Sequence, residues 1–352
     1  MLSAASAREW RSRVGMVVPV WFSPTMAPET MRDFVTATLQ DVEVLAAPRH
    51  VVLVVDGCPR AEAPTQTAAA ALAARSGEEP VVLQRGQNEG KGGAVCRGLE
   101  HLLAHSHVTR LCVRDCDNDH SIWDLPRLVE LADHISAAEG TERLFVVGGR
   151  SSVHHPLGNA RGEHETVLNR VTRDAVAFAL AREGRAPETK YLGLVPAPTL
   201  YPEGVPDLQS GYKLYTRETA PLVIESLRRA HREDPDAGCL RWGAEFMAAV
   251  ELYLAGAIAG QAPRTTYDQQ PQTTFDESDM VGTFGVQIAW LLRRLAVPLQ
   301  PATAWLDGAV AASWWRTSPR GADELLRLRR TVLQAVYGDP QAAPEPSFPP
   351  RL

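Results

Sequence analysis

Three aspartates at alternating positions follow a short apolar run near the middle of the chain. Asp115, Asp117 and Asp119 lie in the segment 114–120, Arg-Asp-Cys-Asp-Asn-Asp-His, directly after the run 109–113. Carboxylates this close repel and raise one another's pKa unless a cation sits among them. Divalent cations prefer such oxygen ligands, and this pattern after a strand suits a cation that holds a nucleoside diphosphate. A polar turn explains an isolated pair of aspartates at least as well, so the surrounding segments decide.

A second segment with binding potential is the glycine-rich stretch 88–94, Asn-Glu-Gly-Lys-Gly-Gly-Ala. Gly90 and Gly92 allow the backbone to approach a ligand closely. A helix that starts near Lys91 would offer free N–H groups and the positive end of its dipole to an anion. The spacing is not that of a Walker A loop. A plain glycine-rich turn is the alternative for this stretch, which begins at Asn88.

Three further acidic residues lie at places where ligands bind. Asp56 ends the apolar run 50–55 and could accept hydrogen bonds from a nucleobase or ribose. An Asp-Gly turn explains it equally well. Asp207 precedes an amide, a hydroxyl and a predicted strand, so it could bind sugar hydroxyls or the acceptor or cap a loop. Glu245 opens an apolar helix, where acidic residues are favoured in any case.

The elements that would position these residues alternate between strand and helix in the first half. We predict strands at 14–20, 50–55, 80–83, 109–113 and 143–147, and helices at 28–45, 63–75, 91–105 and 124–138. Strands that are apolar throughout and separated by helices indicate an α/β fold with a mostly parallel sheet covered on both faces. Ligands of such folds bind beyond the carboxyl ends of the strands, where the segments above would meet.

The second half is less regular. Its predicted elements are helices at 163–183, 217–232 and 242–256, strands at 208–216 and 263–267, a Pro-rich loop at 196–206, helices at 279–295 and 322–337, and a Pro-rich tail from 339. The last two helices would form a C-terminal helical extension of the α/β domain.

In its motifs and their order the chain resembles family-2 glycosyltransferases of the GT-A fold. The resemblance is carried by Val18-Pro19-Val20, Val55-Asp56-Gly57, the stretch 88–95 and the stretch 115–120. It is greatest to the polyprenyl-phosphate sugar transferase branch, such as dolichyl-phosphate mannose synthases. Later matches are Gly148-Gly149-Arg150, Asn169-Arg170, the segment 207–213, and the helix 245–256 with Pro263 after it.

The resemblance implies a Rossmann-like GT-A domain at 1–275, with a nucleotide-sugar half at about 14–150 and an acceptor half at about 151–275. A helical extension at 276–338 and a tail at 339–352 would follow. The implied activity is metal-dependent transfer of a sugar from a nucleoside diphosphate sugar to an acceptor, with inversion. The acceptor would be a small soluble metabolite or a polyprenyl phosphate.

The resemblance also implies roles for single residues. Asp117 and Asp119 would bind Mg²⁺ or Mn²⁺, while Asp115 would face the ribose or hold its loop. Asp207 and Glu245 are the candidates for a base that deprotonates a hydroxyl acceptor. The remaining residues expected to contact the nucleotide or its phosphates are Pro19, Asp56, Asn88, Gly90, Lys91, Gly92, Arg150 and Arg170.

Departures from the family pattern motivate a second hypothesis. The stretch Pro19-Val20-Trp21-Phe22-Ser23 stands where the family has P-x-Y-N-E, Asp119 replaces a frequent Gln, and Met247 replaces a second acid near Glu245. A non-catalytic module that binds sugar nucleotides is therefore the alternative. A nucleotidyltransferase would need a Gly-rich loop after the first strand, which Pro19-Val20-Trp21 does not provide.

Bulk properties restrict the partners and the compartment. The net charge of −6 gives no pull toward nucleic acid. Five cysteines without framework spacing, and no apparent leader or membrane-spanning run, indicate a cytoplasmic protein. The stretch 288–295 and the pair Trp314-Trp315 permit peripheral membrane contact, but we favour core packing for both.

Overall fold

The computed structural model describes residues 4–192, 206–235, 238–267, 279–338 and 346. The predicted Pro-rich loop 196–206 and the predicted tail 339–352 lie outside the described residues, except for Pro206 and Pro346. Among the described residues, no helix is long and apolar enough to cross a bilayer. The five cysteines are all buried and form no disulfide, as expected for small core residues.

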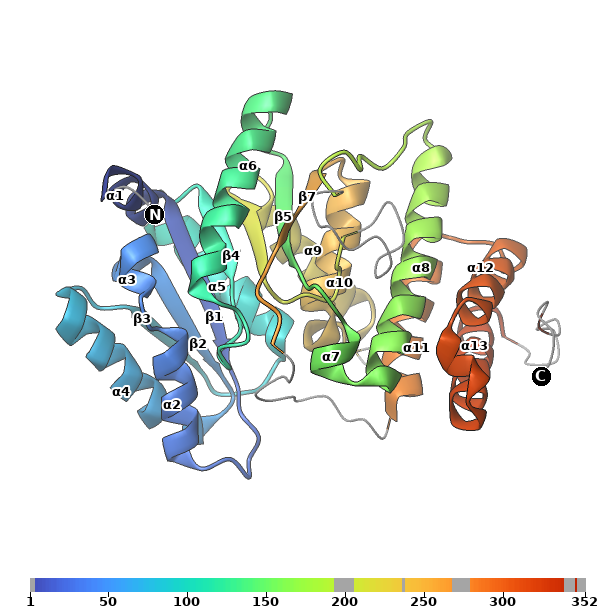
Figure 1. The fold of residues 1–352 in the computed structure, drawn as a ribbon, viewed down its shortest axis with the longest axis horizontal. Coiled ribbons are helices and arrows are strands. Elements are labelled where there is room, and N and C mark those ends of the chain that lie inside the picture. Colours follow the sequence, from blue (N-terminus) through green and yellow to red (C-terminus); the bar gives the residue numbers. More distant parts are fainter. Residues whose placement is uncertain (1–3, 193–205, 236–237, 268–278, 339–345, 347–352) are drawn as a thin grey trace.

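A seven-stranded sheet with the order β3-β2-β1-β4-β6-β5-β7 forms the centre of the molecule (Figure 1). Only β6 is antiparallel to its neighbours, so the sheet is mostly parallel, as predicted. This order and the single reversed strand are consistent with a GT-A-like fold. The strands are β1 (Val14–Val20), β2 (Val51–Asp56), β3 (Val81–Arg85), β4 (Arg110–Val113), β5 (Leu144–Gly149), β6 (Lys213–Thr216) and β7 (Ile258–Pro263).

Alternate residues of the buried strands enter two separate cores, one on each face of the sheet. Met16 and Cys112 enter the first core, and Val17 and Val113 enter the second. Helices of the first face are α1 (Ala4–Arg13), α2 (Pro28–Thr38), α3 (Val42–Leu45), α4 (Pro59–Ser76) and α6 (Leu125–Glu139). Helices of the second core are α5 (Lys91–His105), α8 (Asn159–Ala181), α9 (Ala220–Glu233) and α10 (Cys239–Leu254). This two-sided cover confirms the predicted α/β class.

The C-terminal extension is part of the second core, and in Figure 1 its last two helices lie beyond α8. It consists of α11 (Met280–Arg294), α12 (Leu299–Ala311), the short turn η5 (Trp314–Thr317) and α13 (Pro319–Tyr337). Within the stretch 288–295, Ile288, Leu291, Leu292 and Leu295 are buried in this core. Their burial supports core packing for the amphipathic stretch.

Several predicted boundaries were wrong for local reasons. The helix predicted at 28–45 is interrupted because Asp41 adopts a left-handed conformation with φ of 59°. The strand predicted at 263–267 lies earlier, as β7, and the strand predicted at 208–216 begins only at Lys213. The helix α12 was not predicted; its Pro301 lies in the first turn, where proline is tolerated.

Three short elements lie in the connections, one before β2, one after β4 and one after β5. They are η1 (Pro48–His50), η2 (Ile122–Asp124) and α7 (His154–Leu157).

A buried ion pair joins the last two helices of the extension. Arg329 Nε lies 2.5 Å from Asp307 Oδ1, and the two side chains are 2% and 4% exposed. We expect Asp307→Ala to lower the free energy of unfolding by about 3–5 kcal/mol, because the guanidinium remains buried without this partner. Denaturant unfolding measures the loss. The double variant Asp307→Leu with Arg329→Met should be nearly neutral, and an equally large loss in the double variant would contradict this reasoning.

Candidate active site at the carboxyl edge of the sheet

A cavity of about 600 Å³ opens at the carboxyl ends of the parallel strands. Its walls come from the ends of β1, β2, β4 and β5, the start of α5, the loop before β6, and the helices α10 and α11. The predicted site residues that line it are Pro19, Asp56, Asn88, Gly90, Lys91, Asp115, Asp117, Asp119, Arg150 and Glu245. The structure therefore brings most of the predicted residues together.

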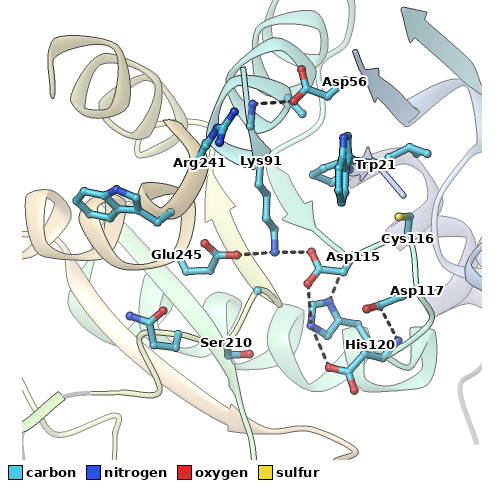
Figure 2. Close-up of a pocket in the computed structure, with 18 of the residues that line it drawn as sticks. Trp21, Asp56, Lys91, Asp115, Cys116, Asp117, His120, Ser210, Arg241 and Glu245 are labelled. Atoms are coloured by element: carbon cyan, nitrogen blue, oxygen red, sulfur yellow. Dashed lines mark hydrogen bonds and ion pairs between the residues drawn. The ribbon is translucent and has the colours of Figure 1, made fainter. Parts of the chain in front are cut away.

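Lys91 lies at the centre of the site, between two carboxylates (Figure 2). Its Nζ is 2.5 Å from Asp115 Oδ1 and 2.5 Å from Glu245 Oε1. Burial by itself lowers the pKa of Lys91, but the charges of the two carboxylates outweigh it and raise that pKa. Burial likewise opposes ionisation of Asp115, but the charge of Lys91 outweighs it and lowers the pKa of Asp115 to about 2. The pair between Lys91 and Asp115 is thus fully charged at neutral pH.

His120 holds the acidic segment in place. Its ring stacks on Tyr212 with a centroid distance of 4.8 Å, and its Nδ1 accepts a hydrogen bond from the Asp115 amide at 3.1 Å. Burial places the pKa of His120 well below its ordinary value, so the ring is neutral at physiological pH. We therefore assign His120 a positioning role for Asp115.

Asp117 and Asp119 differ in their surroundings, although both line the cavity. Asp119 Oδ2 is 3.0 Å from a guanidinium nitrogen of Arg264, and the Asp119 amide donates to Asp117 Oδ1 at 3.1 Å. Burial, followed by the charge of Asp115, raises the pKa of Asp117 to about 7. Asp117 makes no ion pair with a described residue, so a bound cation would relieve its unfavourable charge.

The carboxylates of Asp117 and Asp119 suit a cation whose remaining ligands would be substrate phosphates and water. In the described part of the chain, no three His, Cys, Asp or Glu side chains gather into a metal site of their own. Mg²⁺ is commonly held by one or two carboxylates together with phosphate oxygens and water. Asp117 suits this arrangement, whereas one oxygen of Asp119 is already engaged by Arg264. Both residues stay predicted ligands of Mg²⁺ or Mn²⁺.

The glycine-rich loop is fixed by Asp56 and by contact with α10. Asp56 Oδ2 accepts from the Gly90 amide at 2.8 Å, and Asn88 Oδ1 accepts from the same amide at 2.8 Å. Gly90 has φ of +88°, and a Cβ there would lie 2.6 Å from the Arg241 Cα. A Cβ on Gly92 would lie 2.8 Å from a backbone oxygen of α10. Gly92 thus packs against a helix and does not line the cavity, contrary to its expected role.

Arg150 and Asp207 form a buried pair at the end of β5. Arg150 Nε lies 2.7 Å from Asp207 Oδ2, and another of its nitrogens lies 2.7 Å from Glu165 Oε2. Asp207 has no exposed surface and does not line the cavity. Burial raises its pKa, but Arg150 outweighs this effect and lowers it. The position of Asp207 therefore does not support its expected role as a base, which leaves Glu245.

Arg170 is also displaced from the expected site. Its guanidinium donates to the Ala309 carbonyl of α12 at 3.4 Å, and it does not line the cavity. The residue points to the C-terminal extension because it lies on the part of α8 that packs against α12. The expectation that Arg170 binds phosphate is thus not supported by its position.

Sequence reasoning missed several residues that line the cavity. Arg241 lies one helical turn before Glu245 on α10, a spacing that indicates a shared helix face. It is exposed and makes no ion pair with any described residue, so it is the cation best placed for a substrate phosphate. Arg264 was missed because the last strand was placed too late. The other unpredicted lining residues include Arg161, Gln209, Ser210, Trp242, Thr283 and Gln287.

Comparisons with known proteins do not identify the function of this site. No protein-family model matches the chain, and no curated protein matches it. Among solved structures, the chain is similar to residues 1–349 of S. aureus TarS, with 13% sequence identity and a TM-score of 0.40. The match covers 93% of this chain and 92% of that one. A TM-score this low carries no functional argument, so function has to be inferred from the site.

The contact between Gly92 and α10 can be tested by a matched pair of glycine variants. We expect Gly92→Ala to destabilise the fold by about 1–3 kcal/mol, because the added methyl group meets backbone that cannot move aside easily. A Cβ at Gly86, just before the loop, meets nothing within 4 Å. Gly86→Ala should therefore change stability by less than about 0.5 kcal/mol. Equal unfolding midpoints for the two variants in denaturant would refute the predicted contact.

The environment of Asp117 predicts a pH dependence of stability in metal-free protein. Its pKa rises from the ordinary 3.8 to about 7 on folding, so the folded chain binds this proton more tightly than the unfolded chain. The contribution of protonated Asp117 to the free energy of unfolding is therefore lost as the pH increases from about 4 to about 7. We expect Asp117→Asn to raise the unfolding temperature at pH 8, but not at pH 4.

The exposed variant Asp33→Asn on α2 is the control for this measurement and should follow the wild-type pH profile. A gain for Asp117→Asn that is the same at both pH values would argue against a raised pKa at this position.

Proposed function

We propose that this chain is a metal-dependent glycosyltransferase that moves a sugar from a nucleoside diphosphate sugar to an acceptor, with inversion. The observation that carries this proposal is the cluster of Lys91, Asp115 and Glu245 beside Asp117, inside a cavity of about 600 Å³ at the strand ends. Such a cavity suits a small substrate. The cluster offers a fixed cation for a leaving diphosphate and a carboxylate for an incoming hydroxyl.

The charges around the cavity support a cation as a further component. The lining carboxylates are Asp56, Asp115, Asp117, Asp119 and Glu245, and the lining basic residues are Lys91, Arg150, Arg161, Arg241 and Arg264. These groups balance one another, so a bound diphosphate would bring uncompensated negative charge. A divalent cation held at Asp117, with Asp119 beside it, would neutralise the phosphates and stabilise the leaving group.

Lys91 and Arg241 would bind the diphosphate at the start of α5. Figure 2 shows Arg241 beside the start of α5 and the Lys91 side chain extending from there to the centre of the cavity. Negative charge grows on the leaving diphosphate as its bond to the sugar breaks. Cations already fixed at that place stabilise the transition state without reorganising. Asp56 and Asn88 would act indirectly, since both hold the Gly90 amide.

Glu245 would act as the base for a hydroxyl acceptor. The acceptor oxygen forms a bond to the anomeric carbon, and its proton passes to Glu245. The bond between the anomeric carbon and the diphosphate breaks, and the diphosphate keeps the electron pair. Attack on the face opposite the leaving group inverts the anomeric configuration, and the sugar passes through an oxocarbenium-like transition state.

The remaining features of the proposal concern partners and compartment. The acceptor is a small soluble metabolite or a polyprenyl phosphate, nucleic acid is not a partner, and the protein acts in the cytoplasm. The burial of Trp315 and of the apolar face of α11 supports core packing for these residues. Trp314 is 52% exposed, so core packing was wrong for this member of the pair.

A non-catalytic module that binds sugar nucleotides is the second candidate. The departure at Trp21-Phe22-Ser23 favours it, and the engagement of Asp119 by Arg264 adds a second observation. A panel of nucleoside diphosphate sugars with Mn²⁺ separates the two candidates. Binding without hydrolysis or transfer would support the module.

Replacement of Glu245 tests the proposed base. We expect Glu245→Gln to lower kcat by about 10²–10⁴-fold because the amide cannot accept the acceptor proton. Nucleoside diphosphate binding, measured by thermal shift, should persist. Arg170→Met is the matched control and should retain wild-type activity, since Arg170 lies outside the cavity. Full activity in Glu245→Gln would exclude Glu245 as the base.

A further inference from the structure

The C-terminal extension contributes directly to the cavity wall. Thr283 and Gln287 of α11 line the cavity, and their spacing of four residues puts them on one face of the helix. Gln287 is 2% exposed, which is unusual for an amide unless a partner requires it. This wall was not expected from the sequence, where the extension had no assigned role.

Gln287 is connected to the centre of the site through the loop before β6. Gln209 Nε2 donates to Gln287 Oε1 at 3.1 Å. Two residues later, a Cβ on Gly211 would lie 2.6 Å from Asp115 Oδ2 and 2.7 Å from Lys91 Nζ. Gln209 therefore lies on a loop that contacts the charged centre, and its hydrogen bond links this loop to Gln287 of α11.

The polar side chains of Gln209, Thr283 and Gln287 are uncharged and have groups available for hydrogen bonds to a ligand. Within the described chain, neither Gln287 Nε2, Gln209 Oε1 nor Thr283 Oγ1 makes a hydrogen bond, although all three residues line the cavity. An amide N–H, an amide carbonyl and a hydroxyl together donate and accept hydrogen bonds. A ligand hydroxyl group also donates and accepts, so neutral hydroxyl groups would pair with all three.

Two basic residues that line the cavity are committed to buried carboxylates. Arg150 and Arg161 both line the cavity, and both pair with Glu165, at 2.7 Å and 3.2 Å. Arg150 also pairs with Asp207 at 2.6 Å. Arg241 lies against Gly90, beside the start of α5, where the proposed function puts the diphosphate. A phosphorylated acceptor would therefore displace an existing ion pair, whereas a neutral one would not.

Aromatic contacts hold α11 rigidly against the α/β domain. Trp290 packs edge-on against Trp242 and Phe246 of α10, with ring centroids 6.3 Å and 5.8 Å apart. Phe284 stacks on His164 of α8 at 5.4 Å. Side chains held on packed helices lose little freedom on binding, which favours selective recognition.

We propose that Gln209, Thr283 and Gln287 form the acceptor subsite and that it selects a neutral polyhydroxylated molecule, such as a free sugar or polyol. This inference rests on the proposed function and narrows it, because it favours a hydroxyl acceptor over a polyprenyl phosphate. Glu245, the base that a hydroxyl acceptor needs, lines the same cavity as these three residues.

Matched acceptor pairs test the proposal on the full chain. The pairs are glucose with glucose 6-phosphate and glycerol with glycerol 3-phosphate, together with a short-chain polyprenyl phosphate in detergent. We expect the wild type to transfer to a neutral member with the higher kcat/KM. Preference for a phosphorylated member, or donor hydrolysis without transfer to any neutral acceptor, would overturn the proposal.

Variants of the wall test the residues themselves. Thr283→Val and Gln287→Leu should each raise the acceptor KM about tenfold, as expected for one lost hydrogen bond, and leave the Kd for nucleoside diphosphates unchanged. The control is Thr303→Val on α12, a buried hydroxyl that has no hydrogen-bond partner and lies outside the cavity. Thr303→Val should keep the wild-type KM.

The outcomes separate the acceptor proposal from the proposed function. An unchanged acceptor KM in both folded wall variants overturns the acceptor subsite, and unfolding temperatures verify that each variant is folded. A wild-type chain that binds and hydrolyses no nucleoside diphosphate sugar overturns the proposed function instead, which the donor assays detect without any acceptor.

Discussion

The position of Lys91 between Asp115 and Glu245 is the constraint on which the site depends. A lysine with two carboxylates 2.5 Å away, each side chain less than a quarter exposed, is stable only if all three groups stay in place. Loss of one partner would leave charge poorly compensated in a partly buried place. The three residues come from α5, from the end of β4 and from α10, so this one contact fixes three elements relative to one another.

The sheet topology explains how these elements reach one place. Parallel strands deliver Asp56, Asp115 and Arg150 to the same edge. Because β6 runs in the opposite direction, its amino end lies at that edge, together with the loop that precedes it. The loop before β6 therefore enters the cavity, where Gly211 leaves no room for a side chain beside Lys91.

The extension completes the wall of the cavity through Thr283 and Gln287 of α11. Its helices bury a continuous apolar core with α8 and α10, and this packing orients Thr283 and Gln287 toward the site. One cavity thus contains two kinds of polar group. Lys91 contacts Asp115 and Glu245 at the start of α5, whereas α11 contributes the uncharged Thr283 and Gln287.

The sequence by itself determined the α/β class, most strands, and the acidic and glycine-rich segments, because apolar periodicity and strand-end motifs are local properties. Lys91 and Glu245 were also identified, but not their contact, which joins residues 154 positions apart. Only the tertiary structure decided that Asp207 pairs with Arg150, that Arg170 points to α12, and that α11 lines the cavity. Such outcomes depend on packing between distant elements, and no local pattern encodes which buried charge finds which partner.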